Sequence, residues 1–452
     1  MKLTWHDYDN TLQDTPNLNC PQPHELNTDT RNLRPGQWFL PLKGKKFDGH
    51  TLIPEAIQKG CRGYFSEQDI QHPTGVLVKS TLQSYQNAAL AWRRQSSATC
   101  IALTGSVGKT TTREMLACAF QEAGPVLKTS ENNNNEIGVP KTLLEINKDH
   151  RTVLIEIGAR HVDDIGALTP FVEAEIGICL GAADSHLEIF GSHDNLVRTK
   201  SQIFQHSKTK FAIVPMDQAE LVEKAKATHA QVITFGTHLL SDVRICNFKR
   251  TEQHGLKVSL SVYGSLDLFD IELPIFHQAW SHNIAAVCAT AIAAGLPLEK
   301  VRKGLAHFQG VEGRFHITKT ETHTIIDDTY NASPASMRAG LKTLHSWLPQ
   351  PLTLLLGDMS ELGPDEVLAH QELAADINAL NPQQVITVGR LTKNIKLAKK
   401  INHIHVDCAK NVDISLLSKH ALVYAKASNG IGLKNVLNRL HAYMKDSSCS
   451  TT

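Results

Sequence analysis

The sequence predicts an α/β protein built from three domains, and three observations carry that prediction. The chain has 452 residues, more than one hydrophobic core usually organises, which favours about two to four domains. Between residues 100 and 236, apolar runs alternate with helix-like segments, the pattern of βαβ units around a buried parallel sheet. A second series of such runs begins near residue 314.

The first unit, residues 1–98, alternates short apolar runs with turn-forming residues and predicts a small α/β domain. WFLPL (38–42) and GVLVK (75–79) predict short strands. IPEAIQKG (53–60) predicts a short helix that ends at Gly60, and LQSYQNAALAWRRQ (82–95) predicts an amphipathic helix. SSATC (96–100) follows as a short linker, so we place the first boundary near residue 98.

The second unit, residues 99–312, contains the series of buried strands. Residues 243–274 alternate apolar and polar side chains, which predicts antiparallel strands beside the parallel ones. SHNIAAVCATAIAAG (281–295) predicts a helix capped by Ser281 and terminated by Gly295. The runs that predict parallel strands are CIALTG (100–105), TVLIEIG (152–158), AEIGICLG (174–181), FAIVP (211–215) and QVITFG (231–236).

The third unit, residues 313–452, repeats the alternation and predicts a Rossmann-like α/β domain. We expect hinges at its boundary near residue 312 and at the earlier one near residue 98. Its predicted strands are THTIIDDTY (322–330), LTLLLGDM (352–359), QVITVG (384–389), IHVD (404–407) and ALVYA (421–425).

Composition argues against several classes of protein. The net charge is +1 and the pI about 7.7, so no charge excess points to nucleic acid or to a membrane surface. The sequence has no apolar run of bilayer length and its start has no signal-peptide core, which predicts a cytoplasmic protein without membrane insertion. The 9 cysteines are scattered and the 23 histidines lack metal-binding spacings, which favours reduced thiols and no zinc site.

The strongest functional motif is TGSVGKTTTREML (104–116), which joins a strand to a helix through a glycine-rich turn. Main-chain N–H groups of such a turn cradle phosphate oxygens, Lys109 can reach the β- and γ-phosphates, and Thr110 can ligate magnesium. The standard spacing places glycine where Leu103 stands, so the motif is a shorter variant; a chance glycine-rich turn is the alternative. The residues predicted to bind ATP here are Gly105, Ser106, Val107, Gly108, Lys109, Thr110 and Thr111.

Other candidate side chains follow further strands. Glu156 ends the run VLIEIG, where a carboxylate faces the ligand crevice of a parallel sheet and can hold Mg²⁺; a solvated strand-end glutamate is the alternative. His186 and Lys200 are weak signals on their own, because a loop histidine is often structural and a helical lysine often solvated. Arg314, which lies beside two glycines in GVEGRF (310–315), can clamp phosphate or occupy a surface turn.

Taken together, these segments resemble the Mur ligase family, ATP-dependent amide ligases that build the peptide of bacterial cell-wall precursors. The resemblance covers essentially the whole chain. Within the family, DDTYNASPASM (327–337) and GDMSELG (357–363) are most similar to the ligases that add D-alanyl-D-alanine. The other matching segments are TDTRNLRPGQWFLPLKGKKFDGH (28–50), TGSVGKTT (104–111), NNNNEIGVPKTLL (132–144), EIGARH (156–161), SHLEIFGS (185–192), Lys200 and GR (313–314).

The resemblance implies an activity. ATP would phosphorylate the carboxylate of a UDP-N-acetylmuramoyl-tripeptide, and the amine of D-alanyl-D-alanine would displace phosphate from the acyl phosphate. It also implies a UDP-binding N-terminal domain and a central ATPase-type domain. Members of the family are mostly monomers, so a monomer is expected. The third residue of the acceptor peptide stays open.

The resemblance also assigns roles to residues of this chain. Catalysis falls to Lys109, Glu156, His186, Lys200 and Arg314. One Mg²⁺ would be held by Thr110 and Glu156, and a second by His186 and a carbamylated Lys200. Asn283 and Asp328 would contact the nucleoside of ATP. The predicted substrate-binding residues are Thr30, Arg31, Asp48, Asn132, Asn134, Asn135, Tyr330 and Asn331.

Several positions depart from the family pattern. Glu131 and Asp163 stand where glycine is usual, and the asparagine run 132–135 has Asn133 in a variable slot. His277 lies six residues before Asn283 rather than four. The other departures are Cys179–Leu180, Pro215–Asp217 and Lys426–Asn429.

These departures keep two other functions open. One is a ligase of the same family with a different amine or acyl substrate. The other is a non-catalytic nucleotide-binding protein, which the retention of every predicted catalytic side chain argues against. A solvated asparagine loop remains the alternative to a functional one.

Overall fold

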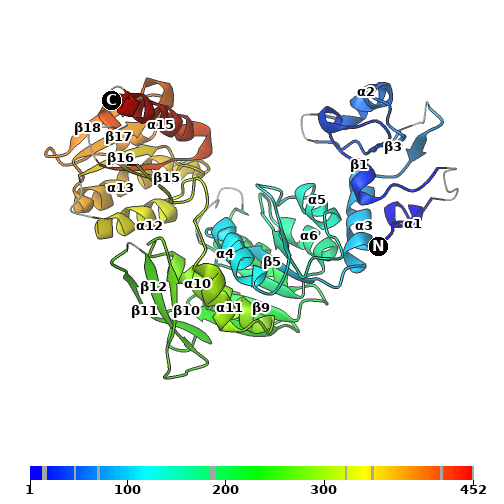
Figure 1. The fold of residues 1–452 in the computed structure, drawn as a ribbon, viewed down its shortest axis with the longest axis horizontal. Coiled ribbons are helices and arrows are strands. Elements are labelled where there is room, and N and C mark those ends of the chain that lie inside the picture. The colour runs from blue at the N-terminus through cyan, green and yellow to red at the C-terminus, as the bar shows by residue number, and fades with distance from the viewer. Residues whose placement is uncertain are drawn as a thin grey trace.

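The structure, a computed structural model, describes residues 1–12, 18–44, 47–68, 72–183, 190–253, 255–320, 323–347, 351–417 and 421–449, with side chains up to residue 444. Among these residues the strands form three sheets, which confirms the three-part α/β class. Figure 1 shows the N-terminal and C-terminal units on either side of the central unit, with the helices packed on the sheets. Within the described residues, no helix has the length and apolar character needed to cross a bilayer.

The N-terminal unit is a parallel sheet in the order β1-β2-β3-β4. Its centre is aromatic: Trp5, Tyr8, Trp38 and Phe65 have ring centroids 5.1–6.2 Å apart. Gly63 lies under the ring of Trp38, where an added Cβ would stand 2.5 Å from it. The elements are α1 (Trp5–Tyr8), β1 (Leu26–Asn27), β2 (Trp38–Phe39), α2 (Ile53–Gln58), β3 (Gly63–Ser66), β4 (Gly75–Leu77) and α3 (Thr81–Arg94).

The central unit is a nine-stranded sheet in the order β13-β12-β11-β10-β9-β8-β5-β7-β6. Pairing is parallel from β6 to β11 and antiparallel from β11 to β13, as the two sequence patterns predicted. Its strands are β5 (Thr99–Thr104), β6 (Val126–Lys128), β7 (Thr152–Glu156), β8 (Ile176–Cys179), β9 (Phe211–Pro215), β10 (Gln231–Gly236), β11 (Val243–Arg250), β12 (Leu256–Val262) and β13 (Phe269–Leu273).

Helices cover both faces of the central sheet. One face packs against α4, α10 and α11, and the other against helices that include α5 and α6. The helices are α4 (Lys109–Gln121), α5 (Gly138–Leu144), α6 (Asp164–Val172), α8 (His193–Ser201), α9 (Ala219–Lys226), α10 (Trp280–Ala293) and α11 (Leu298–Leu305).

The predicted cap of α10 was wrong, whereas its predicted end was right. The helix begins at Trp280, so Ser281 lies inside the first turn and donates its hydroxyl to the carbonyl of Gln278 at 2.8 Å. An N-cap side chain accepts from the helix N–H groups instead, which Ser281 does not do. Gly295 follows the helix with φ +69°, the left-handed backbone that favours glycine at a helix end.

The C-terminal unit is a six-stranded sheet in the order β14-β15-β19-β16-β17-β18. All neighbouring pairs are parallel except β14 with β15, a strand pair that the sequence pattern did not reveal. Its elements are β14 (His316–Lys319), β15 (Thr324–Asp328), α12 (Pro334–Leu344), β16 (Leu352–Gly357), α13 (Glu366–Leu380), β17 (Gln384–Val388), β18 (Asn402–Val406), α14 (Ile414–Leu417), β19 (Leu422–Lys426) and α15 (Leu433–Cys449).

The GDM segment that follows β16 has a structural use. The carboxylate of Asp358 accepts from the backbone N–H groups of Leu391 and Thr392 at 3.0 and 2.8 Å. Gly389 allows this approach, because an added Cβ would lie 2.5 Å from that carboxylate. Asp358 therefore joins the ends of β16 and β17.

Candidate functional site

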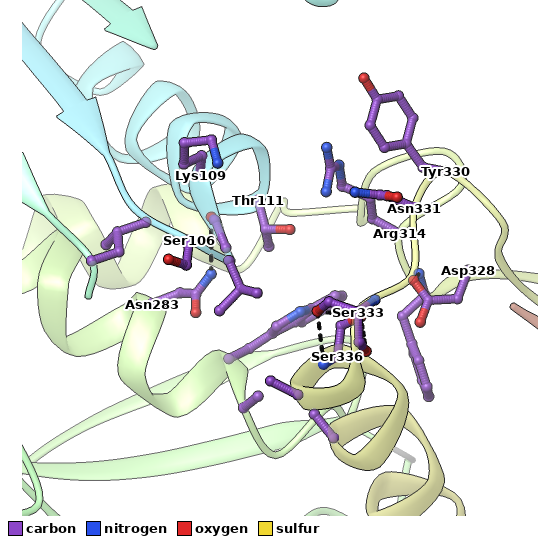
Figure 2. A pocket seen from close by; sticks show the side chains of 18 of the residues that line it. Ser106, Lys109, Thr111, Asn283, Arg314, Asp328, Tyr330, Asn331, Ser333 and Ser336 are labelled. Atoms are coloured by element: carbon purple, nitrogen blue, oxygen red, sulfur yellow. Dashed lines mark hydrogen bonds between the residues drawn. The ribbon is translucent and has the colours of Figure 1, made fainter. Parts of the chain in front are cut away.

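A cavity of about 470 Å³ lies between the central and C-terminal units. The central unit supplies the loop before α4 and the start of α10, and the C-terminal unit supplies the segments around Arg314 and Asp328 and the start of α12. In Figure 2, Ser106, Lys109 and Thr111 lie on one side and Arg314, Asp328 and Tyr330 on the other. The cavity therefore joins residues about 200 positions apart in the chain.

The phosphate loop lies where its motif predicts, between β5 and α4. Gly105 and Gly108 have φ of +155° and +82°. A Cβ on Gly105 would lie 2.9 Å from the side chain of Leu180, so this position requires glycine. Lys109 begins the helix, and its ammonium donates to the carbonyl of Gly105 at 2.7 Å. The loop is thus closed on itself, with its lysine beside the cavity.

Glu156 ends β7 as predicted and is buried at 3% exposure. One carboxylate oxygen accepts from the Asn134 amide at 3.1 Å, and the other from the Thr110 hydroxyl and the Arg113 guanidinium, each at 3.1 Å. Its backbone N–H donates to Thr129 Oγ1 at 2.9 Å. Glu156 therefore has one fixed orientation, and a buried carboxylate needs such partners.

The donor atoms of Thr110 and Glu156 fit a hard cation. Hydroxyl and carboxylate oxygens are the ligands that Mg²⁺ prefers, and the two side chains already touch. Within the described residues, no group of three histidine, cysteine or carboxylate side chains converges as a metal cage. Phosphate oxygens and water usually complete a Mg²⁺ site of this kind. The predicted ligand His186 lies outside the described residues.

Lys200 is buried in α8 at 4% exposure. Burial is the main cause that lowers the pKa of its ammonium to about 7, and the positive charge of Lys109 adds to the effect. Burial also lowers the pKa of Lys109, which Glu156 opposes. The side chain of Cys179, at the end of β8, lies in the electrostatic range of both lysines. Lys200 is therefore a buried amine that can lose its proton near neutral pH.

The C-terminal wall of the cavity carries Arg314 and Asp328. The guanidinium of Arg314 lies 4.1 Å from the ring centroid of Tyr330, a cation–π contact. Asp328 accepts from Lys426 at 2.8 Å, from Tyr424 at 3.0 Å and from the N–H of Phe315 at 3.2 Å. Burial nevertheless raises the pKa of Asp328. Figure 2 shows Asn331 beside Arg314, on the same loop as Tyr330.

The asparagine run divides its side chains between two tasks. Asn132 accepts from the Tyr330 hydroxyl, and Asn134 donates to Glu156 at 3.1 Å, so both reach the cavity wall. Asn135 instead caps α5, where its Oδ1 accepts from the N–H of Gly138 at 2.9 Å. Asn133 donates to the Ser130 hydroxyl at 2.8 Å. Every amide has a partner within the protein, so the loop is ordered rather than a solvated tract.

The two unusual acidic residues occupy left-handed backbone. Glu131 has φ +46° and Asp163 has φ +67°. Glycine adopts this conformation without strain, which explains the usual glycine at both positions. The side chain of Glu131 is exposed, whereas its carbonyl accepts from Arg113 at 3.2 Å. Asp163 accepts from Gln202 at 2.5 Å, so neither carboxylate faces the cavity.

The floor of the cavity combines the predicted residue Asn283 with aromatic residues that sequence analysis did not select. Asn283 donates weakly to the carbonyl of Gly108 at 3.4 Å, beneath the phosphate loop. His277 stacks on Trp280 with ring centroids 5.2 Å apart, and Phe315 meets His277 edge-on at 4.5 Å. Burial lowers the pKa of His277 to about 3, which keeps the ring neutral. An aromatic cluster flanking predicted site residues is a signal that could have identified this floor.

The predicted UDP-binding residues do not line this cavity. Thr30 is buried, and its carbonyl accepts from Lys59 at 2.8 Å. Arg31 extends into solvent and pairs with Asp29 at 2.7 Å, and Asp48 caps the turn before α2. All lie in the N-terminal unit, which Figure 1 places on the far side of the central unit from the C-terminal unit.

Three family models match successive parts of the chain. Residues 22–95 match the Mur ligase family catalytic domain, residues 103–291 the Mur ligase middle domain, and residues 313–432 the Mur ligase glutamate ligase domain. A Buchnera aphidicola protein named UDP-N-acetylmuramoyl-tripeptide--D-alanyl-D-alanine ligase is 32% identical, with 92% of each chain covered.

Solved structures of two similar proteins share the fold. MurF from Acinetobacter baumannii has a TM-score of 0.83 and 29% identity, with 92% of each chain covered. MurF ligase from Thermotoga maritima, in complex with ADP, has a TM-score of 0.85 and 26% identity, covering 93% of this chain and 98% of that one.

Proposed function

The chain belongs to the Mur ligase family, and we propose from this premise that it joins D-alanyl-D-alanine to UDP-N-acetylmuramoyl-tripeptide at the expense of ATP. The product is UDP-N-acetylmuramoyl-pentapeptide, a precursor of the bacterial cell wall. The relatives and structures named above carry that activity or the MurF name over nearly their whole length. As a ligase of this class, the protein belongs in the cytoplasm and acts as a monomer.

The observation that carries the proposal is the cavity between the phosphate loop and Arg314. Phosphoryl transfer depends on positioning and on neutralising charge, more than on covalent chemistry by the protein. Lys109 lies on one wall and Arg314 on the other, so two cations flank one space. The ADP complex of the similar Thermotoga ligase supports a nucleotide in this cavity.

The reaction proceeds in two transfers. A carboxylate oxygen of the tripeptide bonds to the γ-phosphorus of ATP, and ADP leaves. The amine of D-alanyl-D-alanine then bonds to the acyl carbon, loses a proton, and the tetrahedral intermediate expels phosphate. During the first transfer, Lys109 turns from the Gly105 carbonyl toward the phosphate, and Arg314 leaves the Tyr330 ring to bind the transferred group.

Magnesium belongs to this proposal as a partner of ATP, and two ions are proposed. Thr110 and Glu156 would hold one ion, which would supply charge neutralisation for the phosphates. His186 and a carbamylated Lys200 serve the second. A pKa of about 7 supports the carbamate, because only the neutral amine can attack CO₂. Carbon-13 NMR of protein equilibrated with labelled CO₂ should show a carbamate signal that Lys200→Met removes. A wild-type spectrum without that signal would exclude the carbamate on Lys200.

The other ends of the substrates belong to the remaining units. Residues 1–98 bind the UDP group through Thr30, Arg31 and Asp48. Residues 313–452, after the boundary near residue 312, form the C-terminal ligase domain. Asn132, Asn134, Tyr330 and Asn331 contact the reacting groups, and Asn135 supports them from the helix cap. Asn283 and Asp328 contact the nucleoside of ATP. The UDP end then lies apart from the phosphate cavity, so the tripeptide must span the central unit.

A phosphate-release assay with each substrate omitted in turn tests the proposal. Release should require ATP, UDP-N-acetylmuramoyl-tripeptide and D-alanyl-D-alanine together, and mass spectrometry should show the pentapeptide product. Loss of release when Mg²⁺ is withheld is expected, with EDTA-treated protein as the starting material. Release that persists without D-alanyl-D-alanine would contradict the assigned amine.

A related ligase with another amine is the second candidate, favoured by substituted positions around the cavity. Leu180 lines the cavity, and Ala427 follows the cavity residue Lys426. A panel of single amino acids and dipeptides, offered in place of D-alanyl-D-alanine, separates the candidates. Faster phosphate release with any other amine would favour the second candidate, a ligase for that amine.

A further inference from the structure

Arg113 is a buried side chain that contacts Glu156 beside the proposed metal site, and the proposed function leaves it without a role. It lies on α4, three residues after Thr110, and its side chain is 5% exposed. Its guanidinium contacts groups from three elements: Glu156 at the end of β7, Glu114 on α4, and the carbonyl of Glu131 in the asparagine loop. Nε and Nη2 donate to Glu114, whereas Nη1 donates both to Glu156 and to the Glu131 carbonyl, so the five donors of the planar group serve three partners.

The charges around Arg113 alternate in sign. Lys128 on β6 pairs with Glu114, Glu114 pairs with Arg113 at 2.8 Å, and Arg113 pairs with Glu156 at 3.1 Å. The series ends at the carboxylate that touches Thr110. Arg113 therefore donates to the same Glu156 oxygen as Thr110 and compensates the charge of that carboxylate when no cation is bound.

Arg113 also holds the asparagine loop. Its Nη1 donates to the Glu131 carbonyl at 3.2 Å and to Glu156 at 3.1 Å, so one nitrogen joins the loop to the strand end. Glu131 has left-handed backbone at this point, and its side chain points to solvent. Three residues along, Asn134 donates to the same Glu156. Loop and carboxylate are thus fixed to each other twice.

We propose that Arg113 is a positioning residue that locks Glu156 and the asparagine loop together for metal and phosphate binding. This inference rests on the proposed function, because the cation is the one assigned to Thr110 and Glu156. Arg113 contacts neither substrate nor cation and acts through Glu156 and Glu131. Lysine has one nitrogen at the same reach, so it can pair with one carboxylate but cannot contact all three groups.

Hydrogen exchange of the protein without ligands tests the lock directly. Arg113→Met removes the donors and keeps a long apolar side chain. Amide exchange over residues 130–137 should become at least about tenfold faster, as expected when a loop loses its anchor. Arg113→Lys should lie between Arg113→Met and wild type. The matched control is Arg93→Met, which removes another buried arginine, 6% exposed, from its pair with Glu175 far from the cavity.

Metal affinity provides the second readout. Mn²⁺ binding to the protein with ADP, followed by electron paramagnetic resonance, should weaken about tenfold to 100-fold in Arg113→Met, the usual cost of losing a ligand's supporting partner. Arg93→Met should lower the melting temperature and leave Mn²⁺ binding unchanged.

The outcomes separate the possibilities. If Arg113→Met matches Arg93→Met in both readouts, Arg113 is structural and the inference fails. Tighter Mn²⁺ binding would make Arg113 an electrostatic competitor, which also overturns it. If the wild type binds no Mn²⁺ with ADP, the metal assignment of the proposed function fails, and exchange over residues 130–137 still decides whether Arg113 anchors the loop.

Discussion

The two junctions between the units are built differently. At the first, α3 of the N-terminal unit packs against α5 of the central unit, and one hydrophobic cluster runs through both units. Arg93 pairs with Glu175 at 2.9 Å and Arg94 with Glu173 at 2.7 Å. The Trp92 indole adds a hydrogen bond to the carbonyl of Ile146 at 2.8 Å.

At the second junction a hydrophobic cluster also runs through both units, but polar contacts and aromatic rings there surround a cavity. Tyr330 donates to Asn132, and Arg250 donates to the Ser346 carbonyl while lying 5.3 Å from the Trp347 ring centroid. Phe315 bridges the aromatic floor and Tyr424, and the ring centroids of Phe315 and Tyr424 lie 5.9 Å apart.

This difference teaches where the protein can move. Separating the first junction exposes apolar surface and breaks two ion pairs, whereas separating the second exposes apolar surface, breaks a few polar contacts and opens the cavity. Of the two hinges expected from the sequence, the one near residue 312 borders the cavity, so we expect motion there to open the site. Ligase sites that must exclude water and then release products need such a movable wall.

Lys109→Ala tests the second junction at its chemical centre and should have the largest effect. Removing the cation beside the phosphates should lower phosphate release about 10²–10³-fold, as loss of a charge-stabilising donor does in other enzymes. The exposed Lys210→Ala serves as the control. Unchanged turnover in Lys109→Ala would refute the phosphate-loop assignment.

Glu175→Gln tests the first junction. It leaves Arg93 nearly buried without a counter-ion, which should cost about 2 kcal/mol of unfolding free energy, below the full penalty because Glu175 is partly exposed. Denaturant unfolding measures the change, and phosphate release per folded molecule should stay at the wild-type level. Glu55→Gln breaks an exposed pair with Lys59 and should leave the free energy of unfolding nearly unchanged.

The buried Lys200 should make the stability of the protein depend on pH, unlike the paired arginine at the first junction. At the first junction the buried arginine has a carboxylate partner, whereas no described carboxylate pairs with Lys200. Its pKa falls from 10.5 to about 7 on folding. Between these values the unfolded chain binds one more proton, so stability should rise with pH from about 7 to 10, by at most about 1.4 kcal/mol per unit.

Denaturation midpoints in CO₂-free buffer between pH 7.5 and 9.5 measure this slope. Lys200→Met should flatten it, and the exposed Lys224→Met should not. Equal slopes in wild type and Lys200→Met would mean that Lys200 keeps its proton in the folded state.

Tyr330→Phe should have the smallest effect, because it removes one hydrogen bond worth about 1 kcal/mol or less. That loss should shift the second junction toward separation by at most about fivefold. Fluorescence energy transfer between labels on exposed Cys246 and Cys408, in the central and C-terminal units, reports the shift. Tyr263→Phe, at an exposed site, is the control. An unchanged distance distribution in Tyr330→Phe would show that the hydrogen bond between Tyr330 and Asn132 does not hold the second junction closed.

Local patterns in the sequence were enough for the sheets and the phosphate loop. Apolar runs located the long strands, Gly295 located the end of α10, and TGSVGKTT located the turn between β5 and α4. Each signal depends on residues that are neighbours in the chain, where backbone conformation and burial follow side-chain type directly. Strands β1, β3 and β14 were missed because such short segments carry no period.

The tertiary structure decided how those pieces meet. The sequence placed Glu156 at a strand end, but only the packing of α4 against β7 gave it Arg113 as a partner. Folding likewise brought Phe315 against His277 and made the carbonyl of Glu131, rather than its carboxylate, the useful group. Sequence alone therefore determined the elements, the phosphate loop and the family resemblance. Which buried charges pair across elements was set by contacts between distant segments, whose geometry no local pattern encodes.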